Sequence, residues 1–439
     1  MVFGRVVGDR RSIALGLEPL QLGREVELDR DIQLDDPLVS RRHAELHWSE
    51  VHDRYWIRDL GSRNGVFVNG VRIGREILAR GDLIRIGDNV FQLAAAEPGA
   101  PVSEPVSEPV SEPLIDPPFI GRSRSLRRSL ELAARVAALD TPVLILGPTG
   151  TGKDLLAAAI HRASRRSGPL VPVNCAALPG NLVESELFGH ERGAFSGADA
   201  PRAGLFRAAQ AGTLFLDEVG ELAPEIQAKL LRVLESRSIR PVGAVTEAPI
   251  NVRVLAATNR DLAGDVAHGR FRADLYARLT ESVVRLDPLR DRPEDLEPLW
   301  HHFVAQLGEG VRLALGGAAF EAMALHPWPF NVRELRQLVR GALLARPDGG
   351  QLTVEDLPAA MQPPPHGAPA PAPAAAPVSA PPLLAAGEVP SARQLRQLVE
   401  EFHGNIKDVA AFLGKDRKQI YRWLRREHID PNAYRRGNG

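Results

Sequence analysis

Residues 143–153 read VLILGPTGTGK, and the helical pattern DLLAAAIHRAS follows directly at 154–164. An apolar run of β type thus ends in a glycine-rich loop, after which a helix begins. Gly147, Gly152 and Lys153 fit the spacing G-x-x-x-x-G-K, in which loop amides surround phosphate oxygens and the lysine reaches the β and γ phosphates. The helix N-terminus adds a favourable dipole for an anion. The stretch predicts an α/β domain that binds ATP.

A second motif supports this prediction. Residues 213–218 read TLFLDE, an apolar strand pattern that ends in two carboxylates. We expect Asp217 to hold Mg²⁺, directly or through water, and Glu218 to polarise the attacking water. An acidic strand end is common by itself, but a P-loop followed ~65 residues later by this pattern is rarely accidental. ATP and Mg²⁺ are therefore the predicted cofactors.

Length and composition bound the rest of the molecule. At ~150 residues per domain, 439 residues predict about three domains. The formal net charge of −1 leaves nucleic-acid contact to a local basic patch. A single cysteine excludes a disulfide framework and a multi-cysteine zinc site. No apolar run approaches the ~18–20 residues of a membrane span, so we expect a cytoplasmic protein with no membrane partner.

Two segments divide the chain into three folded parts. Residues 97–118 repeat VSEP three times, and residues 362–387 are rich in proline and alanine. Proline removes an amide donor and fixes φ, so both segments are predicted to be extended linkers. We expect a multidomain protein with domains at 1–96, 119–361 and 388–439.

The first part has the pattern of an all-β sandwich, with short alternating stretches such as GVFVNGVRI separated by Gly, Asn and Asp. It contains the pieces GR at 23–24, SRRH at 40–43, GSRNG at 61–65 and NG at 69–70. Each Asn-Gly pair taken alone is explained as a hairpin turn. In this order, the pieces resemble a forkhead-associated (FHA) domain.

The FHA resemblance implies a site for phosphothreonine peptides. Arg24, Ser40 and Arg41 would hold the phosphate, whose charge and three acceptor oxygens suit guanidinium and hydroxyl donors. Arg63 would face the peptide and Asn64 would bind its backbone, while His43 would brace the loop. The partner would be a phosphothreonine protein or a Ser/Thr kinase. An FHA fold that binds no peptide remains an alternative.

The central part carries a dense resemblance to the ATPase domain of sigma-54-dependent transcription activators, which are of the AAA+ class. The resemblance rests on NCAALPGNLVESELFGHERGAFSGA at 174–198 and on the later pieces AATNRDL, FRADLYARL and NVREL. It implies an α/β P-loop ATPase with a helical lid. Asp154 stands where a generic P-loop has a Ser or Thr that ligates magnesium, but this family usually has an acid there.

The same resemblance assigns residues to the nucleotide. Asn174 would pair with Glu218, Asn259 would be sensor I and Arg333 would be sensor II. The implied ATP-binding set comprises Gly147, Pro148, Thr149, Gly150, Thr151, Gly152, Lys153, Asp154, Asn174, Asn259 and Arg333. Arg272 and Arg278 would reach the ATP of the neighbouring subunit, which requires a homo-oligomeric ring. The ring expected from the resemblance is a hexamer. Outside this context each arginine is better explained as a surface ion pair.

The loop at 193–198 reads GAFSGA, where the family usually has GAFTGA. The resemblance makes it the contact with sigma-54 RNA polymerase, formed by Gly193, Ala194, Phe195, Ser196, Gly197 and Ala198. The Ser196 hydroxyl is kept and only the threonine methyl is lost. A second departure is Phe330, which replaces the usual glycine and puts the turn before sensor II in question.

The last part is predicted to be a small all-α helix-turn-helix, since NIKDVAAFLG and DRKQIYRWLRREH each show helical spacing. Residues 403–436 hold nine Lys or Arg against four Asp or Glu. The segment resembles the Fis-type DNA-binding domain of the same activators, with Ile420, Trp423 and Leu424 packed inward. The expected contacts to double-stranded DNA upstream of a promoter are Lys415, Arg417, Lys418, Gln419, Arg422 and Arg425. A short hairpin that docks a protein is the alternative.

Together these features predict an ATP-dependent activator of sigma-54 transcription that is regulated through its FHA domain. Two other hypotheses remain open. One is a DNA-binding regulator whose ATPase no longer acts on sigma-54, for which Ser196 is the discriminating residue. The other is an AAA+ remodelling enzyme that acts on a phosphoprotein, which DNA footprinting would distinguish.

Overall fold

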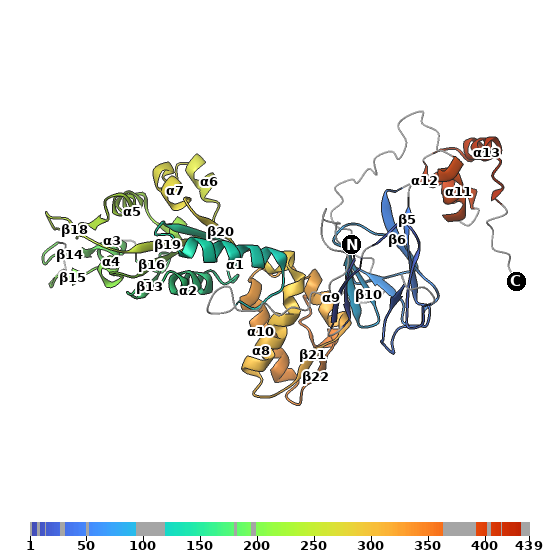
Figure 1. Cartoon of the computed structure of the whole chain (residues 1–439), viewed down its shortest axis with the longest axis horizontal. Helices are drawn as coiled ribbons and strands as arrows, with labels where there is room; N and C mark the ends of the chain where they lie inside the picture. Colours follow the sequence, from blue (N-terminus) through green and yellow to red (C-terminus); the bar gives the residue numbers. More distant parts are fainter. Residues whose placement is uncertain are drawn as a thin grey trace. The chain divides into compact units, whose positions relative to one another are not determined.

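The computed structural model describes residues 2–6, 9–13, 15–26, 31–49, 52–93, 119–179, 182–194, 199–362, 392–401, 405–413 and 415–431 (Figure 1). They form a β-sandwich, an α/β body with a helical lid, and a cluster of three short helices. Among the described residues, no helix is long and apolar enough to cross a membrane.

The N-terminal part is a sandwich of two sheets with strand orders β2-β1-β11-β10-β7-β8 and β4-β3-β5-β6-β9. Alternation places Leu22, Ala44, Ile57, Val66 and Ile86 in the core between them. The all-β prediction is confirmed. The strands are β1 Val2–Val6, β2 Asp9–Ile13, β3 Leu20–Gly23, β4 Ile32–Gln33, β5 Ala44–Ser49, β6 Arg54–Asp59, β7 Val66–Val68, β8 Val71–Ile73, β9 Arg75–Ile77, β10 Leu83–Ile86 and β11 Asn89–Leu93.

The central part is built on a parallel sheet with strand order β13-β16-β19-β12-β20. Parallel strands buried on both faces read as continuous apolar runs, and every residue of β19 is buried. In the register of the sheet, Asn174 lies opposite Asp217, so the carboxyl ends of β13 and β16 meet at one edge. The strands are β12 Val143–Leu146, β13 Leu170–Asn174, β16 Thr213–Asp217, β19 Arg253–Thr258 and β20 Val283–Arg285.

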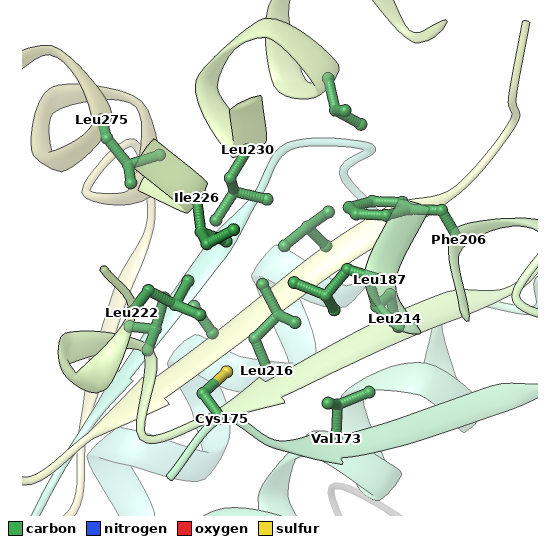
Figure 2. Close-up of a cluster of buried hydrophobic side chains, with 14 of the residues drawn as sticks. Val173, Cys175, Leu187, Phe206, Leu214, Leu216, Leu222, Ile226, Leu230 and Leu275 are labelled. Carbon is green, nitrogen blue, oxygen red and sulfur yellow. The ribbon is translucent and has the colours of Figure 1, made fainter. Parts of the chain in front are cut away.

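Helices cover both faces of this sheet. Strand β16 shows the division, because Leu214 and Leu216 pack on one face and Phe215 on the other. The helices are α1 Arg124–Ala137 and α2 Lys153–Ala163 on the Phe215 face, and α3 Val183–Phe188, α4 Leu205–Ala208, α5 Pro224–Ser236, α6 Leu262–Ala267 and α7 Ala273–Leu279 on the other. Figure 2 shows the core of the second face, where Cys175 lies among aliphatic side chains. Burial raises the pKa of the Cys175 thiol to about 12, so this cysteine is an inert packing residue.

Two short hairpins and a 3-10 turn complete the body. Strands β14 Gly189–His190 and β15 Arg202–Ala203 pair with each other, as do β17 Ser238–Ile239 and β18 Ala248–Pro249. The 3-10 turn η1 Val219–Glu221 follows the carboxyl end of β16.

A mainly helical lid follows β20, which confirms the prediction of a helical lid. Its helices are α8 Leu296–Leu307, α9 Gly317–Leu325 and α10 Asn331–Ala345, its paired strands are β21 Leu313–Leu315 and β22 Gly350–Leu352, and its 3-10 turns are η2 Leu289–Asp291, η3 Pro293–Asp295 and η4 Val354–Asp356. Trp300 and Trp328 are fully buried, and each indole N–H donates to a backbone carbonyl at 2.8 Å. The Asp295 carboxylate accepts from the amides of Arg122 and Ser123, which ties the lid to the start of α1.

The C-terminal part comprises α11 Ala392–Glu401, α12 Ile406–Phe412 and α13 Arg417–Arg426. The last two form the predicted helix-turn-helix, and α11 adds a third helix. Ile420, Trp423 and Leu424 are buried, as predicted. The Asp416 side chain caps α13 by accepting from the Lys418 amide at 2.7 Å.

Candidate nucleotide site and peptide-binding loops

The predicted P-loop joins the carboxyl end of β12 to the start of α2. Gly150 and Gly152 have φ values of 80° and 100°, a conformation that glycine adopts without steric cost. Lys153 is only 5% exposed, and its ammonium donates to the Gly147 carbonyl at 3.1 Å. It also lies 3.4 Å from the Glu218 Oε1 atom. The structure therefore brings the lysine and the second carboxylate of the strand motif together.

The two carboxylates suit a divalent cation. Asp217 ends β16, and burial together with the neighbouring Glu218 charge raises its pKa, while Lys153 acts in the opposite sense. The raised pKa means that the ionised form of Asp217 is disfavoured in this environment. A cation bound beside it, in addition to Lys153, would stabilise that ionised form. Carboxylate oxygens are the ligands that Mg²⁺ prefers, so the donor set fits this ion.

Glu218 is held in place by the neighbouring strand β19. Its Oε2 atom accepts from the Asn259 backbone amide at 3.2 Å and from the Thr258 hydroxyl at 3.5 Å. The Asn259 side-chain amide donates to the Thr149 hydroxyl of the P-loop at 3.1 Å. Asn259 thus contacts both the P-loop and Glu218, and its role as sensor I stays a prediction.

Asn174 lies beside these groups but has other partners. Its Oδ1 atom accepts from the amides of Ala176 and Ala177 at 3.0 and 3.3 Å, closing a turn after β13. The Glu218 carboxylate contacts Lys153, Thr258 and Asn259 instead. The pairing of Asn174 with Glu218 stays a prediction for another state of the site.

Sequence reasoning missed Asn331, the residue that joins the lid to the P-loop. Asn331 is 1% exposed and has a φ of 52°. Its Oδ1 accepts from the Leu289 amide at 2.8 Å, and its Nδ2 donates to the Thr149 carbonyl at 2.9 Å. The signal available was an asparagine at the start of a helical pattern after a proline, since Asn tolerates the left-handed region.

The turn before α10 accommodates Phe330 without strain. Its φ is −109°, a value open to any residue, so a glycine is not needed there. The position that requires glycine is Gly150 of the P-loop, which packs against this turn. A Cβ atom on Gly150 would come within 2.2 Å of the Phe330 carbonyl oxygen and 3.2 Å of the Arg333 Cβ. This close approach places Arg333 next to the P-loop.

The two arginines expected to act across a subunit boundary lie at the two ends of α7. Arg272 pairs with Asp274 at 2.7 Å, and Arg278 pairs with Glu281 at 2.8 Å. Both side chains are about half exposed. Their partners are local surface carboxylates, and a role at a neighbouring nucleotide stays a prediction.

The predicted sigma-54 loop is described only at its start. Gly193 has a φ of 79°, and the Ala194 amide donates to the Glu191 carbonyl at 3.2 Å. Phe195, Ser196, Gly197 and Ala198 lie outside the described residues. The stretch before the loop is paired with the β17–β18 hairpin, because Val242 exchanges two backbone hydrogen bonds of 2.9 Å with Gly189 and Glu191.

In the sandwich, the loops predicted to read phosphothreonine converge on Ser40. The Arg24 amide donates to the Ser40 carbonyl at 3.0 Å, and the Arg63 amide donates to the Ser40 hydroxyl at 3.2 Å. Asn64 donates to the Leu38 carbonyl at 2.6 Å. The guanidinium groups of Arg24, Arg41 and Arg63 belong to exposed residues. Three cations and one hydroxyl are thus gathered on neighbouring loops.

His43 and Gly23 support these loops from below. His43 is completely buried; its Nδ1 accepts from the Ser40 amide and its Nε2 contacts the Gly65 carbonyl, both at 3.0 Å. These two contacts assign the neutral tautomer with the proton on Nε2. Gly23 was missed as a site residue, yet a Cβ there would lie 2.1 Å from the Arg41 carbonyl oxygen. Only glycine allows this approach of the two loops.

The basic residues predicted to contact DNA lie on α13 and just before it, and all are exposed or half-buried. At the start of α13 an open hollow of about 510 Å³ is lined by Lys407, Lys415, Arg417 and Lys418, together with Ala410 and Asp416. Lys407, on α12, was not among the predicted residues. Four cations against the single carboxylate of Asp416 leave the hollow with a positive charge, which favours an anionic ligand such as a phosphate.

Three family models match the chain: an FHA domain at residues 20–87, a sigma-54 interaction domain at 119–285 and an AAA+ ATPase lid domain at 290–373. The chain is 51% identical over 217 residues to the hydrogenase transcriptional regulatory protein HoxA of Cupriavidus necator, a match that covers 48% of the chain and 45% of HoxA. It is 39% identical over 322 residues to the transcriptional regulatory protein GlrR of Escherichia coli K12, covering 72% of the chain and 69% of GlrR. A crystal structure of NtrX from Brucella abortus in complex with ATP has a TM-score of 0.51 and 30% identity, over 71% of the chain and 69% of NtrX.

The P-loop, the acidic strand end and the lid define an AAA+ ATPase unit of the sigma-54 interaction class, joined to an FHA domain. With the GlrR match covering more than two thirds of both chains, the protein belongs to the family of sigma-54-dependent transcription activators. The matched stretch spans less than half the length of HoxA and about two thirds of GlrR. The predicted family and fold are confirmed.

Proposed function

We propose that this protein hydrolyses ATP in a homo-oligomeric ring, a hexamer, and uses the energy to activate sigma-54 RNA polymerase. The observation that carries the proposal is the convergence of Lys153, Glu218 and Asn259 on the P-loop. In this mechanism Lys153 leaves Glu218 to bind the β and γ phosphates. The released Glu218 carboxylate orients and polarises a water, with Asn259 holding its position. Mg²⁺, held by Asp217 when bound, would neutralise phosphate charge.

Ring assembly completes the site in this proposal. Arg272 and Arg278 would exchange their local carboxylates for the γ phosphate of a neighbouring subunit, which stabilises the charge of the transition state. Arg333, beside Gly150, would instead contact the phosphates of the ATP bound to its own chain.

The output and tether follow from the other parts. The 193–198 loop would contact sigma-54. The β17–β18 hairpin, which is hydrogen-bonded to Gly189 and Glu191 just before this loop, would transmit the nucleotide state. The helix-turn-helix would hold the ring at double-stranded DNA upstream of a promoter, through Lys415, Arg417, Lys418, Gln419, Arg422 and Arg425. The FHA site would take a phosphothreonine made by a Ser/Thr kinase, with Arg24, Ser40 and Arg41 on the phosphate and with Arg63 and Asn64 on the peptide. We expect the protein to carry out this transcription activation in the cytoplasm.

Open-complex formation tests the proposal. Sigma-54 RNA polymerase on supercoiled promoter DNA should open only when the protein and hydrolysable ATP are both present. Phe195→Ala should abolish opening and keep ATP turnover, whereas Leu344→Ala, on an exposed lid side chain, should leave both intact. ATP turnover by the wild-type protein without any promoter opening would favour a remodelling enzyme that does not act on sigma-54.

A further inference from the structure

The threonines of this chain are few and unevenly placed. There are eight, and all lie between residues 141 and 353. The FHA part, both linkers and the C-terminal part contain none. The repeated VSEP linker offers serines instead. A phosphothreonine reader in this protein therefore has no threonine ligand within its own domain, and any ligand in the same protein lies in the ATPase part.

Seven of the eight threonine hydroxyls are engaged inside the fold. Each is buried or half-buried and has a hydrogen-bond partner. The seven pairs are Thr141 with Ser282, Thr149 with Asn259, Thr151 with Pro148, Thr213 with His161, Thr258 with Arg260, Thr280 with Tyr276 and Thr353 with Asp356. A kinase needs a hydroxyl that it can enclose in its own active site, and these seven do not offer one.

Thr246 differs from the other seven. It is exposed, and the part of the chain that the structure describes gives its hydroxyl no hydrogen-bond partner. It lies in the loop of residues 240–247 that joins β17 to β18, two residues before β18 begins. The preceding side chain, Val245, is 86% exposed. A kinase or a reader domain therefore has access to both the hydroxyl and the flanking backbone.

The loop that carries Thr246 contacts the segment that precedes the predicted sigma-54 loop. Val242, on the same hairpin, pairs with Gly189 and Glu191, which precede the predicted sigma-54 loop. A Cβ on Gly243 would lie 3.0 Å from the Ala194 Cβ, so the two segments touch. A bulky group on Thr246 would stand three residues along the chain from Gly243.

We propose that Thr246 is a phosphorylation site and that the FHA site of a second copy of this chain binds it. The proposal rests on the phosphothreonine recognition argued above. A Ser/Thr protein kinase would transfer the γ-phosphoryl group of ATP: the Thr246 oxygen forms a bond to phosphorus, the bond to the β,γ-bridging oxygen breaks, ADP leaves, and the hydroxyl proton passes to the kinase's carboxylate base.

Charge complementarity supports the pairing. Phosphothreonine carries about −1.5 to −2 charges, and the neighbouring Glu247 adds another. The exposed cations Arg24, Arg41 and Arg63 face such a ligand with fixed loops behind them. In a ring, several 240–247 loops and several FHA domains are held at high local concentration, which favours their association. A domain bound at Thr246 would cover the approach to the sigma-54 loop and lower promoter opening without lowering ATP turnover.

The test uses the full-length protein produced without any Ser/Thr kinase, and a fluorescent peptide of residues 239–251. Phosphorylation of the peptide at Thr246 should raise its affinity at least tenfold over the unmodified peptide. Arg24→Ala should abolish that gain, whereas Arg80→Ala, which removes another exposed arginine of the same sandwich, should keep it. A matched phosphopeptide centred on Thr353 should bind at least tenfold less well than the Thr246 phosphopeptide.

A degenerate phosphothreonine library separates this inference from the proposed function. A protein that binds the library but not the Thr246 peptide keeps its phosphothreonine function and refutes the Thr246 site. A protein that binds neither refutes both. Mass spectrometry of the protein isolated from cells that contain its kinase should find phosphate on Thr246. Phosphate confined to other threonines, or found on none, would overturn the assignment.

Discussion

The Lys153 ammonium and the Glu218 carboxylate, 65 residues apart in the chain, lie 3.4 Å from each other beneath the P-loop. Each group neutralises the other, so neither carries its full charge toward an incoming ligand. Triphosphate binding would exchange this pair for a lysine–phosphate pair and free the carboxylate to act on water. The resting contact therefore links nucleotide binding to the formation of the catalytic base.

Lys153→Ala should weaken ATP binding, because the phosphates lose their buried cation. Glu218→Gln should bind ATP about as well as the wild type and hydrolyse it about 10²–10⁴-fold more slowly, since water activation is lost. Fluorescent-nucleotide titration and phosphate release measure the two effects separately. Lys229→Ala, at an exposed lysine, is the control and should change neither. Equal hydrolysis by all four proteins would remove the P-loop assignment.

Subunit mixing should show that the arginines act in trans. Arg278→Ala and Lys153→Ala proteins are each expected to be inactive. A mixture should regain part of the ATP turnover, because some interfaces then combine an intact lysine with an intact arginine. Two differently tagged copies of Lys153→Ala, mixed in the same way, give the baseline. A mixture shown to co-assemble but still inactive would argue against a role across the interface.

Asn331→Asp should loosen the lid while leaving the fold in place. The substitution keeps the oxygen that accepts from Leu289 and replaces the donor to the Thr149 carbonyl with an acceptor. Two oxygens then face each other in a buried contact, which costs on the order of 1–3 kcal/mol. Thermal unfolding should show the loss, and ATP binding should weaken with it. Asn405→Asp, at an exposed position in the C-terminal part, is the control. Unchanged nucleotide affinity would mean that the lid does not read the P-loop through Asn331.

Deleting residues 388–439 should remove site-specific DNA binding and keep ATP turnover. The affinity of the intact protein should fall steeply with salt, because each neutralised phosphate releases counterions. Lys407→Ala should reduce that salt slope, since this lysine lines the basic hollow at α13. DNase footprinting across a salt series provides both measurements. A footprint that survives the deletion would place DNA recognition elsewhere in the chain.

The sequence predicted the elements whose signal is local. The P-loop and the acidic end of β16 each occupy a few consecutive residues, and their spacing is set by the phosphate they surround. The inward face of α13 followed from helical periodicity. In the same way, Ser40 and Arg63 were recognised from short loop motifs, and the structure brings their loops together at a hydrogen bond of 3.2 Å.

Contacts between distant segments were not predictable from such patterns. Asn331 bonds to Thr149 across 182 residues, and no local feature records that distance. Gly23 matters because the backbone of Arg41 passes 2.1 Å from where its Cβ would be, which only the folded sandwich shows. Asn174 was predicted to pair with Glu218, but its side chain closes the turn after its own strand, and that pairing stays a prediction.

The attachment of α10 to the P-loop makes this helix a lever. It has 15 residues, so at 1.5 Å per residue it extends about 22 Å from its pivot at Asn331. A tilt of about 5° at the pivot, following a sub-ångström shift of Thr149 or Gly150, displaces its far end by about 2 Å. Loss of one phosphate at the P-loop would thereby be amplified into a displacement of about 2 Å at the far end of α10. The ring would then convert a chemical step into mechanical displacement through the rigidity of a single helix.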